Sequence, residues 1–112
     1  MTIRDRIKAI QVNLRDHAVT PALAREHLMT LTALLGNVTA EQADADIAYK
    51  RVILKHFEIE QAASRARMHA ETTEEYRRYL EARNLHELVI EMIRSCKRYL
   101  ESLDDELRHS GH

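Results

Sequence analysis

The feature that most constrains the fold is a long helical pattern between Leu85 and Leu107. At ~100° per residue, its apolar side chains fall within one arc of roughly 140° on the helix surface. The arc contains Leu85, Leu88, Val89, Met92, Ile93, Cys96, Tyr99, Leu100, Leu103 and Leu107. The opposite face carries Glu87, Glu91, Arg94, Arg98, Glu101 and Asp105. An arc this wide is typical of a helix that packs against two or more neighbours, so the chain must supply further helices.

The composition favours helices over β-structure. The chain contains 2 glycines and 1 proline, which leaves little material for tight turns. Charged residues make up 31% of the chain and apolar residues 45%, a balance that is globular rather than disordered. A length of 112 residues fits one domain. We therefore expect a single all-α domain over residues 1–112.

Apolar periodicity, together with start and stop signals, predicts four helices. They span about residues 3–16, 21–35, 40–70 and 73–108. Thr20 and Pro21 supply a hydroxyl cap and a first-turn proline for the second helix, which Gly36 should end. Thr39 and Gln42 then have the spacing of a capping box for the third helix.

The third predicted helix carries apolar side chains on two opposite sides. One stripe consists of Ala43, Ile47, Leu54, Phe57 and Met68, and the other of Ala45, Ala48, Val52, Ile59, Ala63 and Ala66. Such a helix needs neighbours on both sides, and three other helices can hardly supply them. We therefore expect a four-helix antiparallel bundle with two long C-terminal helices, completed by homo-oligomerisation.

The fourth predicted helix changes phase near Asn84. If it continued without interruption, Tyr76 and Leu80 would lie opposite the apolar arc that begins at Leu85. Either the helix breaks near Asn84, or these residues meet a second subunit. The first interpretation is preferred, because Asn84 and Glu87 have the spacing of a new cap.

Charge and cysteine content restrict where the protein acts. The formal net charge of −1 gives no general attraction to nucleic acid or to an anionic membrane, so any such affinity must come from a local patch. The single cysteine, Cys96, excludes a disulfide within the chain, which suits a reducing cytoplasm. The N-terminal residues lack a signal-peptide pattern, and no apolar run approaches the ~20 residues of a membrane span. We expect a cytoplasmic protein with no membrane partner.

The distribution of basic residues predicts an anion-binding surface, here called the predicted basic band. The third helix contributes Lys50, Arg51 and Lys55, and the last contributes Arg94, Lys97 and Arg98. A hairpin that reverses near Thr72 would bring residues 50–55 alongside residues 90–94. Around that turn lie Arg65, Arg67, Tyr76, Arg77 and Arg78, with Tyr79 beside them. Phosphate groups would offset this concentration of like charge, and the tyrosines could stack on bases.

The same basic residues have an alternative interpretation. Arg94 and Arg98 share their helix face with acidic residues three and four positions away, namely Glu87, Glu91, Glu101 and Asp105. That spacing is typical of a solvated helix face laced with ion pairs. The sequence leaves both interpretations open.

One acidic pattern raises an enzymatic alternative. Glu71-Thr-Thr-Glu74 and Glu101-Ser-Leu-Asp104 resemble the paired acidic motif of the all-α nucleotide pyrophosphohydrolases, in which carboxylates hold Mg²⁺ against a triphosphate. In the expected hairpin the two pairs would lie roughly 40 Å apart, so one site would need two subunits. The chain has no glycine-rich phosphate loop and no metal-ligand spacing of the di-iron or zinc-protease kind. We therefore expect no catalytic residues, no metal and no cofactor.

Two runs in the second half of the chain resemble small helical proteins of bacteriophage genomes. The runs are Ser64-Arg-Ala-Arg-Met-His-Ala-Glu-Thr-Thr-Glu-Glu-Tyr76 and Ile93-Arg-Ser-Cys-Lys-Arg-Tyr-Leu100. Such proteins are often encoded near recombination and single-strand-binding genes. The resemblance implies a phage accessory protein in the host cytoplasm, and it carries no functional residue with it.

Three functions follow in order of preference. The first is a non-enzymatic accessory protein that binds single-stranded nucleic acid through the predicted basic band, in recombination or replication. The alternative is a protein-interaction or sequestering module, such as a phage inhibitor of a host defence protein or a binder of an anionic nucleotide. The third is a metal-dependent nucleotide pyrophosphohydrolase. Nucleic-acid binding would weaken steeply with salt, whereas a hydrophobic protein interface would hardly respond.

Overall fold

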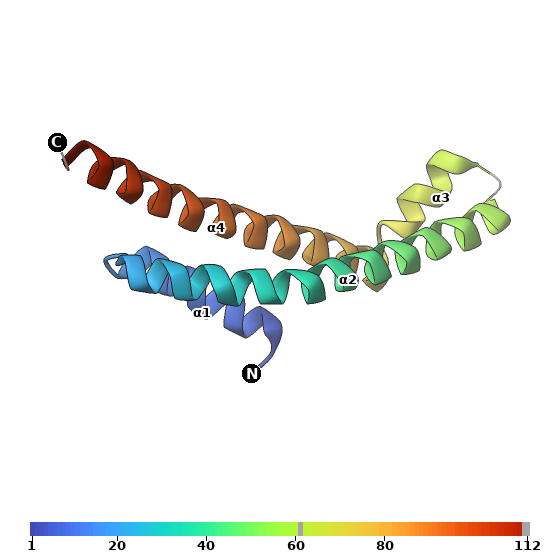
Figure 1. Ribbon diagram of the computed structural model, residues 1–112. Helices are drawn as coiled ribbons and strands as arrows, with labels where there is room; N and C mark the ends of the chain where they lie inside the picture. Colours follow the sequence, from blue (N-terminus) through green and yellow to red (C-terminus); the bar gives the residue numbers. More distant parts are fainter. Residues whose placement is uncertain (61, 111–112) are drawn as a thin grey trace. The chain divides into compact units, whose positions relative to one another are not determined.

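The computed structural model describes residues 1–60 and 62–110, which form four helices and no strand. The helices are α1 (Ile3–Asp16), α2 (Pro21–Glu60), α3 (Ala63–Ala70) and α4 (Glu74–Ser110) (Figure 1). The expectation of an all-α fold is confirmed. Among these helices, none has a stretch apolar and long enough to cross a bilayer.

The contacts of the chain group into two compact units. The first unit comprises Met1–Gly36 and Glu87–His112, and the second comprises Asn37–His86. Each of the two long helices, α2 with 40 residues and α4 with 37, contributes to both units. The expectation of a single domain stays a prediction.

The first unit begins with a well-capped helix. The Thr2 hydroxyl accepts a hydrogen bond from the backbone N–H of Asp5 at 3.1 Å, and the Asp5 carboxylate accepts one from the N–H of Thr2 at 3.1 Å. This capping box satisfies two amide donors that a helix start leaves unpaired. The Thr2 bonds also hold the pKa of Asp5 below its usual value. The bounds of α1 are those predicted.

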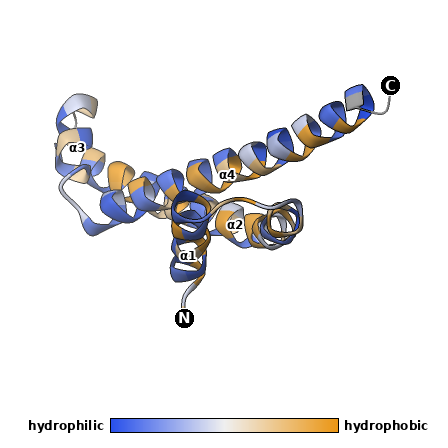
Figure 2. Ribbon diagram, turned by 90° about the vertical axis from the view of Figure 1, so that its left-hand side faces the viewer, coloured by the Kyte–Doolittle hydropathy of each residue, from blue (hydrophilic) through white to orange (hydrophobic). Residues whose placement is uncertain are grey.

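The core of the first unit is aliphatic. Its buried side chains come from α1, from the N-terminal part of α2 and from the C-terminal part of α4: Ile7, Ile10, Ala24, Leu31, Leu34, Val89, Met92, Ile93 and Cys96. Hydrophobic residues recur along one side of α4, as its apolar arc predicts (Figure 2). The Tyr99 hydroxyl donates to the Val19 carbonyl oxygen at 2.7 Å and so ties α4 to the segment before α2. Burial raises the pKa of the Cys96 thiol, consistent with an inert core position.

The expectation that Gly36 ends a helix is wrong, because α2 runs through it without interruption. Leu34 and Val38, four residues apart, are buried at 4% and 1% exposure, so the inward stripe continues past the glycine. Gly36 itself is exposed and has an ordinary φ, and a Cβ built on it meets no atom within 4 Å. Burial of the apolar stripe outweighs the ~1 kcal/mol by which a glycine disfavours helix.

Replacing Gly36 with alanine should therefore stabilise the protein. The added methyl group enters open space, and the unfolded chain loses backbone freedom, so we expect a gain of about 0.5–1 kcal/mol. Urea unfolding followed by circular dichroism measures it, with Gly36→Pro as a control that should cost about 3 kcal/mol. A destabilised alanine variant would mean that the helix ends at Gly36 after all.

In the second unit, the chain reverses earlier than predicted. The expected helix over residues 40–70 is divided: α2 ends at Glu60, and Ala62 has the extended backbone of an N-cap before α3, with Gln61 outside the described residues. This earlier reversal brings α3 back beside the end of α2 (Figure 1). The rings of His56 and His69 stack there at 6.0 Å between centroids. Two alanines of α3, Ala66 and Ala70, are fully buried and allow this close packing.

The expected break near Asn84 does not occur, because α4 is continuous through it. Asn84 is exposed in mid-helix, while Ala82 and Leu85 on either side are buried. The tyrosines before it need no second subunit to cover them, since they pack within the second unit. The observed order is thus short, long, short, long, whereas the sequence predicted two short helices followed by two long ones.

Candidate nucleic-acid interface

Three tyrosines meet in the second unit and form what is here called the tyrosine cluster. Tyr49 comes from α2, and Tyr76 and Tyr79 from the first turns of α4. The centroid of the Tyr49 ring lies 5.0 Å from that of Tyr76 and 5.1 Å from that of Tyr79, with the second pair stacked at 26°. These are favourable separations for aromatic pairs. All three side chains are half-buried, so each retains some accessible surface.

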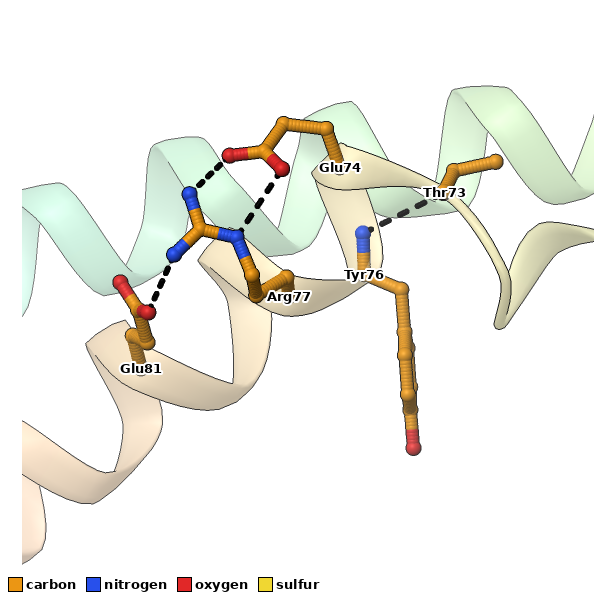
Figure 3. Close-up of polar contacts among 5 residues, drawn as sticks. All are labelled: Thr73, Glu74, Tyr76, Arg77 and Glu81. Atoms are coloured by element: carbon orange, nitrogen blue, oxygen red, sulfur yellow. Dashed lines mark hydrogen bonds and ion pairs between the residues drawn. The ribbon is translucent and has the colours of Figure 1, made fainter.

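A side-chain cap and an ion-pair network adjoin Tyr76 at the start of α4. The Thr73 hydroxyl accepts a hydrogen bond from the backbone N–H of Tyr76 at 3.3 Å and so caps the helix (Figure 3). Arg77, the next residue, is held by the carboxylates of Glu74 and Glu81 on the same helix. The Tyr76 ring points away from this ion-pair network (Figure 3). The network keeps the pKa of Glu74 below its usual value and that of Arg77 above it.

Cationic side chains border the tyrosine cluster. The guanidinium carbon of Arg83 lies 5.7 Å from the centroid of the Tyr79 ring, within the range of a cation–π contact. Lys50 follows Tyr49 on α2, and its ammonium group lies 2.9 Å from the Asp46 carboxylate. That hydrogen bond raises the pKa of Lys50, and the Asp46 carboxylate neutralises the positive charge of Lys50. Of these two cations, Arg83 is the one whose guanidinium contacts a tyrosine ring.

The ionisation of Tyr49 reports its surroundings. Burial is the main cause that raises the pKa of its hydroxyl, followed by the nearby charge of Glu71 and by the two other tyrosines of the cluster. The guanidinium of Arg67 on α3 acts in the opposite direction. The Tyr49 hydroxyl therefore stays protonated at neutral pH and can donate a hydrogen bond. Arg67, on α3, is thus near enough to Tyr49 to affect its ionisation.

A shallow groove opens beside Tyr79. It has a volume of about 340 Å³ and is lined by Thr39, Gln42, Ala43, Asp46 and Tyr79. Its hydroxyl, amide and carboxylate groups can exchange hydrogen bonds with a polar ligand such as a base edge. The tyrosine cluster, its cations and the groove belong to one compact unit.

The expected pairing of residues 50–55 with residues 90–94 is wrong. Tyr49 contacts Tyr76 and Tyr79, and His56 contacts His69, so residues 49–56 of α2 face residues 69–79. The cause is the position of the reversal, which lies between the end of α2 at Glu60 and the start of α3 at Ala63 instead of near Thr72. Eight residues of the predicted basic band lie in the second unit: Lys50, Arg51, Lys55, Arg65, Arg67, Tyr76, Arg77 and Arg78. Arg94, Lys97 and Arg98 belong to the first unit.

Part of the predicted basic band is neutralised by ion pairs along single helices. Lys50 pairs with Asp46, Arg77 with Glu74 and Glu81, and Arg94 with Glu91. This is the pattern of the solvated-face alternative, and it applies to these three residues. The remaining cations are exposed and make no ion pair with another described residue: Arg51, Lys55, Arg65, Arg67, Arg78, Lys97 and Arg98. The second unit thus retains five cations of the predicted basic band, and Arg83 besides, that can meet an external anion.

Sequence reasoning missed two residues of the candidate site, Tyr49 of the tyrosine cluster and Arg83 beside it. The signal for Arg83 was its position one helical turn after Tyr79, which places a guanidinium over the preceding ring. Tyr49 directly precedes two basic residues, yet only the register of the hairpin shows that it meets the other tyrosines.

The acidic pattern of the enzymatic alternative is divided between the two units. Glu71 is the C-cap of α3, and Glu74 begins α4 with its carboxylate held by Arg77. Glu101 and Asp104 lie on α4 in the first unit. Within residues 1–60 and 62–110, no three histidine, cysteine or acidic side chains are grouped closely enough to hold a metal ion.

Comparisons of the chain with protein-family models, with curated proteins and with solved structures find no match. The candidate interface therefore rests on its own geometry and chemistry.

Proposed function

We propose that this is a non-enzymatic protein that binds single-stranded nucleic acid through its second unit. The observation that supports this function best is the tyrosine cluster bordered by Arg67 and Arg83. Aromatic rings offer stacking surfaces to bases of any sequence, and guanidinium groups bind phosphates with paired hydrogen bonds. An accessory role in recombination or replication is what the resemblance to bacteriophage proteins implies.

The proposed contacts divide between base and backbone. An unpaired base stacks on the accessible part of the tyrosine cluster, and its edge reaches the polar groove beside Tyr79. The flanking phosphates bind Arg67 and Arg83, with the unpaired cations of α2, α3 and α4 further along the strand. Duplex DNA keeps its bases stacked inside, so it offers the phosphates alone and binds more weakly.

The test is a fluorescence-anisotropy titration of the protein into fluorescein-labelled oligothymidylate at several salt concentrations. With about three phosphates neutralised, the logarithm of the association constant should fall against the logarithm of salt concentration with a slope of about −2. A duplex of the same length should bind more weakly at each salt concentration. Failure to bind at low salt, or binding that does not respond to salt, would exclude this function.

A second candidate function, a protein-interaction module, is favoured by a separate observation. The second unit exposes large apolar side chains on α2, among them Ile47 and Leu54. Exposed apolar side chains grouped on one face mark protein interfaces more often than nucleic-acid ones. This surface is compatible with nucleic-acid binding, because the tyrosine cluster lies toward the opposite side of α2.

A further inference from the structure

One face of α2 in the second unit, here called the outer face, has no partner among residues 1–60 and 62–110. Its large side chains are Ile47, Leu54 and Phe57, with 49%, 62% and 44% of their surface exposed. Ala40 and Ala43 extend the same face toward the N-terminus and are also exposed. Together with Lys50, these residues recur at alternating steps of three and four, the spacing of a helix–helix seam.

The side chains of the outer face increase in size from its N-terminal to its C-terminal end. Its N-terminal part is small, with Ala40 and Ala43, and its C-terminal part is large, with Leu54 and Phe57. Two copies packed antiparallel about a two-fold axis near residues 48 and 49 would place Ala43 opposite the partner's Leu54, and Ala40 opposite the partner's Phe57. Each large side chain then enters a hole over a small one. Parallel packing would instead set large against large and leave voids between the alanines.

Charge on the flank of the outer face selects the same arrangement. Asp44 and Arg51 lie on one side of the seam, seven residues apart, and neither forms an ion pair with another described residue. Antiparallel packing brings Asp44 toward the partner's Arg51 and, by symmetry, Arg51 toward the partner's Asp44. In parallel packing this flank would face the opposite flank of the partner helix, so Asp44 and Arg51 of the two copies would not meet. Lys50 is compatible with the seam, because its stem can cover apolar surface while its ammonium group stays on Asp46.

We propose that the outer face of α2 is a self-association surface that pairs antiparallel with the same face of a second copy of this chain. The size gradient and the Asp44–Arg51 pairs are both satisfied by one two-fold axis. The proposal does not rest on nucleic-acid binding, and the seam shares Ala43 with the polar groove and Arg51 with the unpaired cations of the second unit.

Association is measured by sedimentation equilibrium of the full chain. The wild-type protein should dimerise, and Leu54→Asp should weaken the dimer by about 100-fold or more, because it sets a carboxylate in an apolar seam. Val12→Asp on α1, which likewise replaces an exposed apolar side chain with a carboxylate, is the control and should leave the dimer unchanged. Circular dichroism verifies that each variant is folded.

Orientation is tested by charge exchange and by cross-linking. Asp44→Arg and Arg51→Asp should each weaken the dimer, and the double variant should recover it. In a Cys96→Ser background, a mixture of Ala43→Cys and Leu54→Cys proteins should form disulfides between the two variants, and neither variant with itself. A wild-type protein that is monomeric at high concentration, a double variant without recovery, or self-linking of Ala43→Cys would overturn the proposal.

Discussion

Replacing Arg67 and Arg83 together with glutamate should weaken binding of a single-stranded oligonucleotide by about 100-fold at low salt. Each arginine is proposed to hold one phosphate, and loss of one such contact costs about tenfold. Both side chains are exposed and neither forms an ion pair with another described residue, so the helices should persist. Anisotropy measures the affinity, and the salt slope should become shallower by about one to two units.

A matched control distinguishes binding at a local site from attraction by the net charge of the whole protein. Lys97→Glu with Arg98→Glu makes the same change in net charge, and both residues are exposed cations of the first unit. If the second unit holds the strand, this control should lose only a few-fold in affinity. Equal losses in the two variants would show that binding follows net charge alone and would contradict a site at the tyrosine cluster.

The largest effect on stability is expected from Leu31→Ala in the first unit. The Leu31 side chain is fully buried, so its truncation removes apolar contacts and leaves a cavity that a helical core closes only in part. Leucine-to-alanine changes at such sites cost about 3 kcal/mol, a large fraction of the stability of a small protein. Thermal and urea unfolding followed by circular dichroism would measure the loss.

A neighbouring position on the same helix supplies the comparison for Leu31. Met29 is 75% exposed, so Met29→Ala should change the free energy of unfolding by no more than about 0.5 kcal/mol. Similar losses at Leu31 and Met29 would mean that the inward face of α2 is not the one described. A selective loss at Leu31 would support the aliphatic core of the first unit.

Local sequence signals, namely caps and apolar periodicity, correctly predicted the bounds of α1 and the start of α2. The bounds of α1 follow from the Thr2 cap and the isoleucine stripe, and α2 begins at Pro21 with the Thr20 hydroxyl accepting from the Leu23 N–H at 3.2 Å. The prediction that a helix ends at Gly36 was wrong because the burial of Leu34 and Val38 outweighs the low helix propensity of glycine. The reversal beside Ala62 has neither glycine nor proline, so no local pattern indicated it.

The position of that reversal also explains why the candidate site was predicted only in part. In a hairpin, moving the reversal by one residue moves every pairing by two. A shift of about ten residues therefore moved the partners of residues 49–56 by about twenty. Tyr76 and Arg67 were identified from their positions in the sequence around the predicted turn, which do not depend on the pairing of the two helices. Tyr49 could be placed only once its contacts with Tyr76 and Tyr79 fixed the register.

The most direct test of the proposed site is the tyrosine fluorescence of a Tyr99→Phe variant during titration with oligothymidylate. The chain has 4 tyrosines and no tryptophan, so this variant emits from the tyrosine cluster alone. Base stacking should quench that emission, with the same midpoint as the anisotropy change, and the quenching should disappear when Arg67 and Arg83 are also replaced by glutamate. An anisotropy increase without any change in tyrosine emission would place the nucleic acid elsewhere on the protein and contradict the proposed function of the cluster.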